Sequence, residues 1–256
     1  MKARLLAFVI LVAFGIVRMP MEARLERKQR ELHYHGARLT LDTRQRLGQM
    51  GFVAALSGFR SLVADVLWIE AHSAWQRTEW GRMKVLFDTV TALQPRNLTF
   101  WDMAGWHMAY NASVAALKDD KQPREALRLK AEREYWHLGE DFYKRGIENN
   151  PDHAFLFEGL ARIYREKFKD HYRAHLMFEE ASKRPDAMAY THRFAAYELA
   201  AVPGKEKEAY ARLKELYDKG EDEHLPTLLK LLEELEEKLN VPAQDRTYSP
   251  ASQPPK

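Results

Sequence analysis

Cysteine is absent from this chain of 256 residues. Without thiols the protein has no disulfide framework, no thiolate zinc site and no cysteine nucleophile. The absence does not identify the compartment, because exported proteins can also lack cysteine. A metal site would need histidine and carboxylate ligands instead.

Catalytic signatures and a strong charge imbalance are also lacking. The sequence contains no Walker loop, no G-x-S-x-G nucleophile motif and no dinucleotide fingerprint. Lysine and arginine number 40 against 37 aspartates and glutamates, a formal net charge of +3. Interspersed charges of both signs argue against a nucleic-acid-binding surface. We therefore expect a protein that is not an enzyme, has no cofactor and binds no nucleic acid.

Strand signals are scarce, since strict alternation and clusters of valine, isoleucine and threonine are rare. Amphipathic segments of helical length are separated instead by well-spaced helix breakers. These breakers are Pro95, Pro123, Pro151, Pro185, the pair Pro203 and Gly204, Gly220 and Pro242. The pattern predicts an all-α domain over residues 47–240.

The first 20 residues form a separate segment. Apolar residues run without a break from Leu5 to Val17, between Arg4 and Arg18. The run is shorter than the roughly 20 residues of a usual span, but the stems of flanking arginines extend such a segment. We expect an uncleaved signal anchor at residues 1–20. A cleaved secretory signal and a buried helix of a soluble protein remain the alternatives.

The segments on either side of the helical domain differ from it in composition. Residues 21–46 are rich in charge and predict a juxtamembrane helix or linker, whereas the proline-rich tail, residues 241–256, is predicted to be disordered. Basic residues flank the apolar run on both sides, so a positive-inside count favours a cytoplasmic domain. A short basic start before an apolar run is nevertheless typical of exported chains. We expect a single-pass protein of the inner membrane whose soluble domain lies on the exported, periplasmic side.

A pattern recurs within the helical domain. The segments GEDFYKRGIENNP and AHLMFEEASKRP share a small residue, an aromatic, a second small residue and a closing proline, at Pro151 and Pro185. The two prolines lie 34 residues apart. The second segment is preceded by a bulky aromatic, a leucine, a small residue and another aromatic at helical spacing. This unit comprises Phe157, Leu160, Ala161, Tyr164, Ala174, Phe178 and Ala181.

The pattern resembles the tetratricopeptide repeat (TPR), which pairs two helices per unit. The unit that precedes the one at 157–181 is split by an insertion around 118–123. Looser units lie before and after these two units. A leucine-lined helix near residue 230 is expected to cap the stack. The resemblance implies a TPR-like helix-hairpin solenoid. The split unit comprises Trp101, Ala104, Gly105 and Met108, then Gly139, Tyr143 and Gly146; the looser ones comprise Trp68, Ala71, Trp75, Phe87 and Val90, then His192, Ala195, Ala196, Leu199, Ala209, Leu213 and Leu216.

A second likeness concerns three short motifs spread over residues 47–185. They are similar to motifs of membrane-anchored, TPR-like bacterial proteins and comprise Gly58, Arg60, Ala64, Asp65 and Trp68, then Pro95 and Arg96, then Ala109, Tyr110 and Asn111. The resemblance implies an accessory component of envelope or transport machinery. Arg60 and Asp65 stand in apolar surroundings, where they either pair internally or face a partner; we favour a buried pair.

In TPR-type stacks, outward positions of the first helices line a groove that binds a peptide or helix. The resemblance assigns such positions to Asp102, Trp106, Tyr110 (or Ala109), Glu158, Arg162 and Arg165, and more loosely to Ile69, Ser73 and Gln76. Trp106 would be a natural anchor, because aromatics and arginines dominate binding energies. The alternative is that Trp106 packs against the insertion helix at 124–149.

Two histidines are a weak metal candidate. His171 and His175 lie four residues apart on one expected helix, with Glu179 one turn further on, a spacing that could hold zinc. The sequence HYRAH lacks the glutamate of a metalloprotease motif. Surface helices offer such pairs by chance, so we expect no metal.

Three functional hypotheses follow, of which the third, an enzyme or metal protein built on helices, has the histidine pair as its only motif support. The first is a membrane-tethered scaffold whose groove binds another protein of a bacterial envelope or transport complex. The second is a structural subunit that stays buried inside a larger membrane complex, which a large exposed apolar patch would favour. The first two name protein partners and a membrane contact through the N-terminal helix.

Overall fold

The computed structural model describes Arg24 and residues 58–247. Every regular element in this part of the chain is helical, which confirms the all-α prediction. The predicted anchor at 1–20 lies outside the described residues, as does all of the juxtamembrane segment except Arg24. None of the described helices is both long and apolar enough to cross a membrane.

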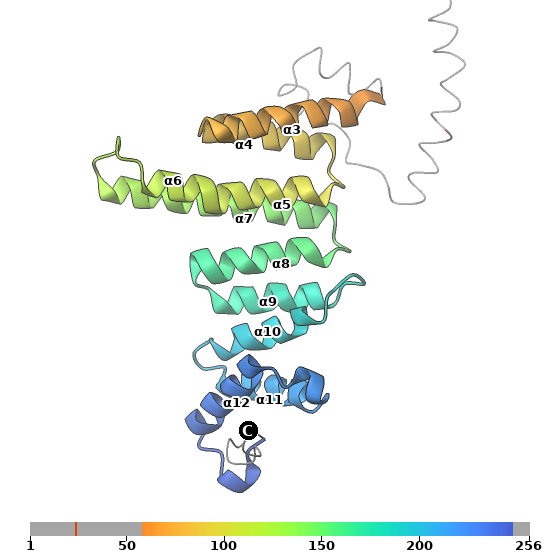
Figure 1. Ribbon diagram of the computed structural model, residues 1–256, viewed down its shortest axis with the longest axis vertical. Helices are drawn as coiled ribbons and strands as arrows, with labels where there is room; N and C mark the ends of the chain where they lie inside the picture. The colour runs from red at the N-terminus through yellow and green to blue at the C-terminus, as the bar shows by residue number, and fades with distance from the viewer. Residues whose placement is uncertain (1–23, 25–57, 248–256) are drawn as a thin grey trace, which may run out of the picture.

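The helices pack as hairpins that follow one another in chain order along the long axis of the molecule (Figure 1). The first hairpin joins α3 (Arg60–Gln76) to α4 (Trp80–Leu93). The second hairpin is longer, and it packs α5 (Leu98–Trp106), η2 (His107–Ala112) and α6 (Ser113–Leu117) against α7 (Glu125–Asn149).

Two shorter hairpins and a final helix complete the stack. The third hairpin packs α8 (Ala154–Ile163), which continues into η3 (Tyr164–Phe168), on α9 (His171–Ser182). The fourth packs α10 (Tyr190–Ala200) on α11 (Glu206–Tyr217). The chain then forms η4 (Glu221–Glu223), α12 (Pro226–Lys238) and η5 (Ala243–Asp245). Throughout, "first helix" means the leading helix of a hairpin, namely α3, α5, α8 or α10.

The prolines end the helices where the sequence predicted. Helix α4 ends two residues before Pro95, α7 two residues before Pro151 and α9 three residues before Pro185. Proline disfavours the helical conformation of the residue before it and lacks the amide proton that a continuing helix requires. The loop between α6 and α7 contains residues 118–123, so the insertion lengthens both helices of the second hairpin as expected.

Small and aromatic side chains interlock in the core. All seven pattern residues of the unit at 157–181 are buried. Tyr143 of α7 lies between two glycines, Gly105 on α5 and Gly159 on α8. A Cβ atom at Gly105 would lie 2.4 Å from Cε2 of this ring, and one at Gly159 would lie 2.1 Å from Cε1. Three helices therefore meet at one ring because two of them have no side chain there.

The C-terminal end corrects one prediction. Leu228, Leu232 and Leu235 of α12 pack on α10 and α11, which agrees with a capping helix. Residues 241–247, predicted as the start of a disordered tail, return to this helix instead. The Thr247 amide donates a hydrogen bond to Glu236 Oε1 at 2.6 Å, and the Tyr210 hydroxyl contacts the same atom at 3.0 Å. The buried Glu236 carboxylate requires such donors, because an unpaired buried charge is costly.

Candidate partner-binding surface

The six predicted groove residues lie on two successive first helices. Asp102 and Trp106 belong to α5 and Tyr110 to η2; Glu158 and Arg162 belong to α8, with Arg165 in η3. Helices α5 and α8 contact each other directly, so these residues share one surface. We call it the first-helix surface, and it continues onto α10.

Both of these first helices end in a π-helical turn, η2 or η3. Such turns are rare and are often found at functional sites. Tyr110 lies nine residues after Trp101, and Glu166 lies nine residues after Phe157, so the two occupy equivalent positions of their units. The Tyr110 hydroxyl donates to Glu166 Oε2 at 2.7 Å, which connects the two hairpins across this surface.

A second connection joins three helices at Asp102. Its Oδ1 accepts a hydrogen bond from the Tyr143 hydroxyl at 2.7 Å, and Arg162 Nη2 lies 3.8 Å from the same atom. Burial raises the pKa of Asp102, and the contacts with Tyr143 and Arg162 oppose that rise. Asp102 therefore stabilises the junction of α5, α7 and α8 as well as facing the surface.

The charges around Arg165 form a continuous network. Arg165 Nη2 contacts Glu166 Oε1 at 2.7 Å, and its Nη1 lies 3.5 Å from Glu198 Oε1 of α10. Nδ1 of His171 lies 2.8 Å from the other Glu198 oxygen. Burial alone would raise the pKa of Glu166, but hydrogen bonds from Arg165 and Tyr110 outweigh it and lower the pKa. These polar groups are thus largely paired with one another.

Aromatic side chains remain accessible beside this network. Trp106 keeps 40% of its surface exposed and stacks on Tyr110 with ring centroids 6.1 Å apart. Lys167 Nζ lies 4.3 Å from the centroid of the Tyr110 ring, within cation–π range. Trp106 is therefore not buried beneath α7. Ala109 and Tyr110 were the alternatives for one outward position. Ala109 is buried and faces Gly139 of α7, so Tyr110 occupies the outward position.

A cavity of about 270 Å³ opens where α8, η3, α9 and α10 meet. Glu158, Arg162 and Arg165 line it together with residues that sequence reasoning missed, Phe178, Tyr190 and Phe194. The Tyr190 hydroxyl donates to Glu158. Burial and this hydrogen bond raise the pKa of Tyr190 to about 12. The four-residue spacing of Tyr190 and Phe194 was the available signal, but it belongs to the unit in which the repeat pattern is weakest.

The candidate metal ligands have other roles. Nδ1 of His175 lies 2.8 Å from the Ala195 carbonyl oxygen, and its Nε2 lies 3.5 Å from Glu179 Oε2. His171 is engaged with Glu198, as described above. Among the described residues there is no group of three or more histidine, cysteine, aspartate or glutamate side chains arranged to hold a metal ion.

The expected buried pair of Arg60 and Asp65 is wrong, because Asp65 is exposed. Arg60 is half-buried, and its Nη2 lies 3.4 Å from the Ala92 carbonyl oxygen of α4. The two residues are five positions apart on α3, a spacing that directs their side chains to different sides of a helix. Ile69 and Gln76, the looser groove candidates on α3, are exposed, whereas Ser73 is half-buried.

Comparison with known proteins found no matching family model, no matching curated protein and no matching solved structure. The function is therefore inferred from the residues of this chain alone. Their arrangement combines exposed aromatic rings, flexible basic side chains and paired carboxylates over three neighbouring first helices. Such a surface can bind an extended or helical segment through aromatic anchors and exchangeable polar contacts.

Proposed function

We propose that residues 47–240 form a TPR-like solenoid that acts as a protein–protein interaction scaffold in a bacterial envelope or transport complex. The observation that carries this proposal is the first-helix surface itself. Residues chosen only by their position in the repeat lie on adjacent helices, contact one another and leave Trp106 accessible. A helix-hairpin stack whose first helices share a surface is the arrangement that TPR-type recognition requires.

The partner segment would bind across α5, α8 and α10. Trp106 and Tyr110 would supply the aromatic anchor, and the cavity beside Tyr190 and Phe194 would accept a side chain. Arg162 and Arg165 would exchange their present carboxylate partners for groups of the incoming segment. The contact of Arg162 with Asp102 is long, at 3.8 Å, and Arg165 contacts the partly exposed carboxylate of Glu166, so these two contacts can be exchanged at a low free-energy cost. The carboxylate of Glu198 is buried, so its contact with Arg165 would be kept.

We also propose that residues 1–20 tether the protein to the inner membrane, with the domain on the periplasmic side. The support is the apolar run from Leu5 to Val17 between basic residues. Tethering would raise the local concentration of the domain near a membrane-embedded partner. A C-terminal alkaline phosphatase fusion, which is active only after export, tests the side of the membrane; an inactive fusion with an active cytoplasmic reporter would contradict it.

One observation favours the second hypothesis, a permanently assembled structural subunit. Helix α3 and its N-cap residue Phe59 form an apolar stripe of side chains with large exposed fractions: Phe59 55%, Leu62 58%, Val66 54% and Ile69 65%. These residues recur at three- and four-residue spacing and therefore lie along one side of the helix. A contiguous exposed apolar stripe is typical of a surface that another protein covers.

Site-specific photo-crosslinking of the full chain in membranes separates the two hypotheses. A benzophenone amino acid replaces Trp106 on the first-helix surface, Ile69 on the stripe, or Leu129, an exposed control residue of α7. The scaffold hypothesis predicts a discrete adduct at Trp106 that weakens when Arg162 is changed to glutamate. The structural-subunit hypothesis predicts adducts at Ile69 that do not depend on Arg162. Equal labelling at Leu129 and Trp106 would contradict the scaffold proposal.

A further inference from the structure

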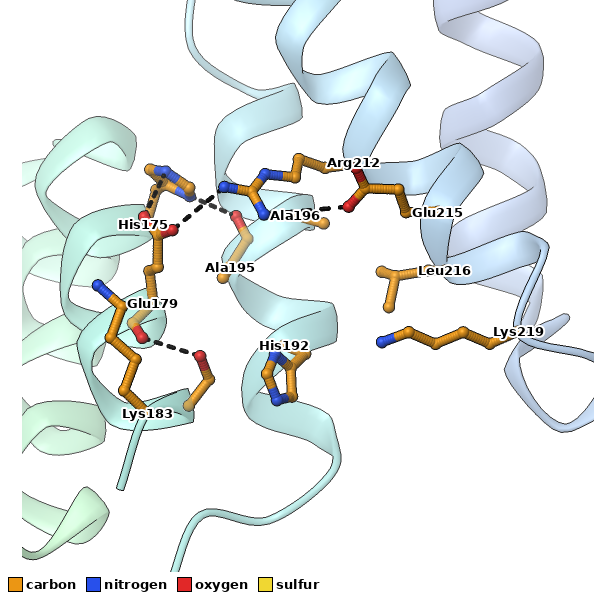
Figure 2. Close-up of a pocket in the computed structure, with 11 residues that line it drawn as sticks. His175, Glu179, Lys183, His192, Ala195, Ala196, Arg212, Glu215, Leu216 and Lys219 are labelled. Atoms are coloured by element: carbon orange, nitrogen blue, oxygen red, sulfur yellow. Dashed lines mark hydrogen bonds and ion pairs between the residues drawn. The ribbon is translucent and has the colours of Figure 1, made fainter. Parts of the chain in front are cut away.

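A second cavity lies between α9, α10 and α11 (Figure 2). Tyr190 and Phe194, which line the first cavity, do not line this one. Its volume is about 270 Å³. Ala195 and Ala196 of α10 and Leu216 of α11 form an apolar floor, while charged and imidazole side chains stand around it. Nothing in the proposed partner-binding surface uses this cavity.

The repeat explains why the cavity is open. His192 lies 35 residues after Phe157, and Lys219 lies 35 residues after Arg184. His192 and Lys219 are therefore the equivalents, in the fourth hairpin, of Phe157 and Arg184 in the third. In the earlier hairpin Phe157 is buried, and the Arg184 guanidinium lies 4.5 Å from the centroid of its ring. In the later hairpin the ring is the smaller, polar and exposed imidazole of His192. The space that an aromatic side chain fills in one hairpin is therefore left open in the next.

The charges at one end of the cavity are already paired. Arg212 Nη2 lies 3.2 Å from Glu179 Oε1, and His175 Nε2 lies 3.5 Å from Glu179 Oε2. Lys183, at the rim, pairs with Glu180 at 2.7 Å. Glu215, the other carboxylate that lines the cavity, lies 4.0 Å from Arg212 Nη1, so both lining carboxylates are beside Arg212.

The other end of the cavity is lined by a lysine and a histidine side chain. Lys219, in the turn that follows α11, extends across the cavity toward His192 of α10 (Figure 2). No carboxylate of the described residues lies within ion-pair distance of Lys219. An ammonium group and an imidazole thus face an opening whose floor is made of alanine and leucine side chains. The combination suits an anionic head attached to an apolar stem.

We propose that this cavity binds a carboxylate carried on a short aliphatic stem. Lys219 and His192 contact the carboxylate oxygens, and the stem packs on Ala195, Ala196 and Leu216. A glutamate side chain of a partner protein and a small free carboxylic acid share this chemistry. The site is independent of the first-helix surface, so it stands whether or not that surface binds a partner.

Calorimetric titration of the purified full chain tests the proposal with three probes. Glutarate represents a free acid, a blocked Gly-Glu-Gly peptide represents a protein side chain, and sulfate is an anion without a stem. We expect saturable binding of glutarate or the peptide, with sulfate about tenfold weaker or worse. Tighter binding of the peptide identifies a protein as the source, and tighter binding of glutarate identifies a free acid.

Matched variants locate the site. Lys219→Gln is expected to weaken binding about tenfold, since a charge-assisted hydrogen bond is lost. Lys214→Gln removes the same charge from an exposed position of α11 outside the cavity and should change affinity less than about twofold. Sulfate binding as tight as that of glutarate, an equal loss in both variants, or no saturable binding by either carboxylate would overturn the proposal.

His192→Phe provides a test that unfolding cannot imitate. The phenyl ring would fill the cavity, and Lys219 would contact this ring as Arg184 contacts the ring of Phe157. We expect binding to be abolished while the midpoint of thermal unfolding rises by about 2–4 °C. Retained carboxylate binding in this variant would contradict the assignment of the site.

Discussion

Gly159→Ala is expected to destabilise the protein by about 3 kcal/mol, the upper part of the range for overpacked cores. The new Cβ would lie 2.1 Å from Cε1 and 2.6 Å from Cζ of Tyr143, distances that no packed atoms adopt. The ring has no room to retreat. Gly105 of α5 is close to the other side of the Tyr143 ring, and the Tyr143 hydroxyl donates a hydrogen bond to Asp102. The clash therefore forces helices α7 and α8 apart.

Urea unfolding of the purified protein measures this effect, and Gly81→Ala is the matched control. Gly81 is an exposed helical glycine of α4, and its added Cβ would meet no atom within 4 Å. Alanine is the better helix former, so this control should stabilise the protein by up to about 1 kcal/mol. Adding Tyr143→Leu to Gly159→Ala should recover part of the loss, because the smaller side chain vacates the contact. Equal stabilities of the two glycine variants would show that the Tyr143 junction is not tightly packed.

Acidification should destabilise the protein through His107, the second-largest effect that we expect. His107 is buried among the rings of Trp75, Phe87 and Trp106. Burial, aided by repulsion from His72, lowers its pKa from 6.5 to about 4. Between these two pH values the unfolded chain binds the proton and the folded chain does not, so stability falls as the pH falls. The loss begins near pH 6.5, is complete near pH 4 and amounts to about 3 kcal/mol.

The measurement is the free energy of unfolding in pH steps for the wild type and His107→Gln. Glutamine keeps a hydrogen-bonding group for Asn111, whose Nδ2 lies 2.8 Å from Nδ1 of His107, but does not titrate. The difference between the two proteins should therefore change by about 3 kcal/mol across this window. His72→Gln should shrink the change, since it removes a positive charge that opposes protonation of His107. Parallel pH profiles for all three proteins would contradict the assignment to His107.

Much of the architecture was predictable because it depends on local chemistry. The ends of α4, α7 and α9 follow from prolines, and the buried seams follow from the helical spacing of Phe157, Leu160 and Tyr164. The tail at 241–247 was not predictable in the same way. Its composition is polar and proline-rich, but Thr247 contacts Glu236 of the preceding helix α12 and Tyr210 of α11.

Some residues of the candidate site could likewise be predicted from the sequence, and others could not. Repeat position predicted Asp102, Trp106, Tyr110, Glu158, Arg162 and Arg165 as outward residues; Glu158 is buried and bonded to Tyr190, and the other five are at least partly exposed. The nine-residue offset of Tyr110 from Trp101 also leads from Phe157 to Glu166, but only the structure shows the hydrogen bond between Tyr110 and Glu166. Repeat position did not identify Tyr190 and Phe194, because the packing of α10 on α9 brings these side chains to the cavity. The buried-pair interpretation of Arg60 and Asp65 failed because their spacing separates them around α3.

By itself, the sequence determined the all-α class, the ends of α4, α7 and α9, and the buried face of the unit at 157–181. These properties depend on side-chain periodicity and on the backbone limits of proline, which act within a few residues. Only the tertiary structure decided which carboxylate pairs with which arginine, which histidine is buried, and where a cavity stays open between hairpins. Those outcomes depend on how closely neighbouring helices approach, and that distance is set by residues such as Gly105, Gly159 and His192 acting across the stack.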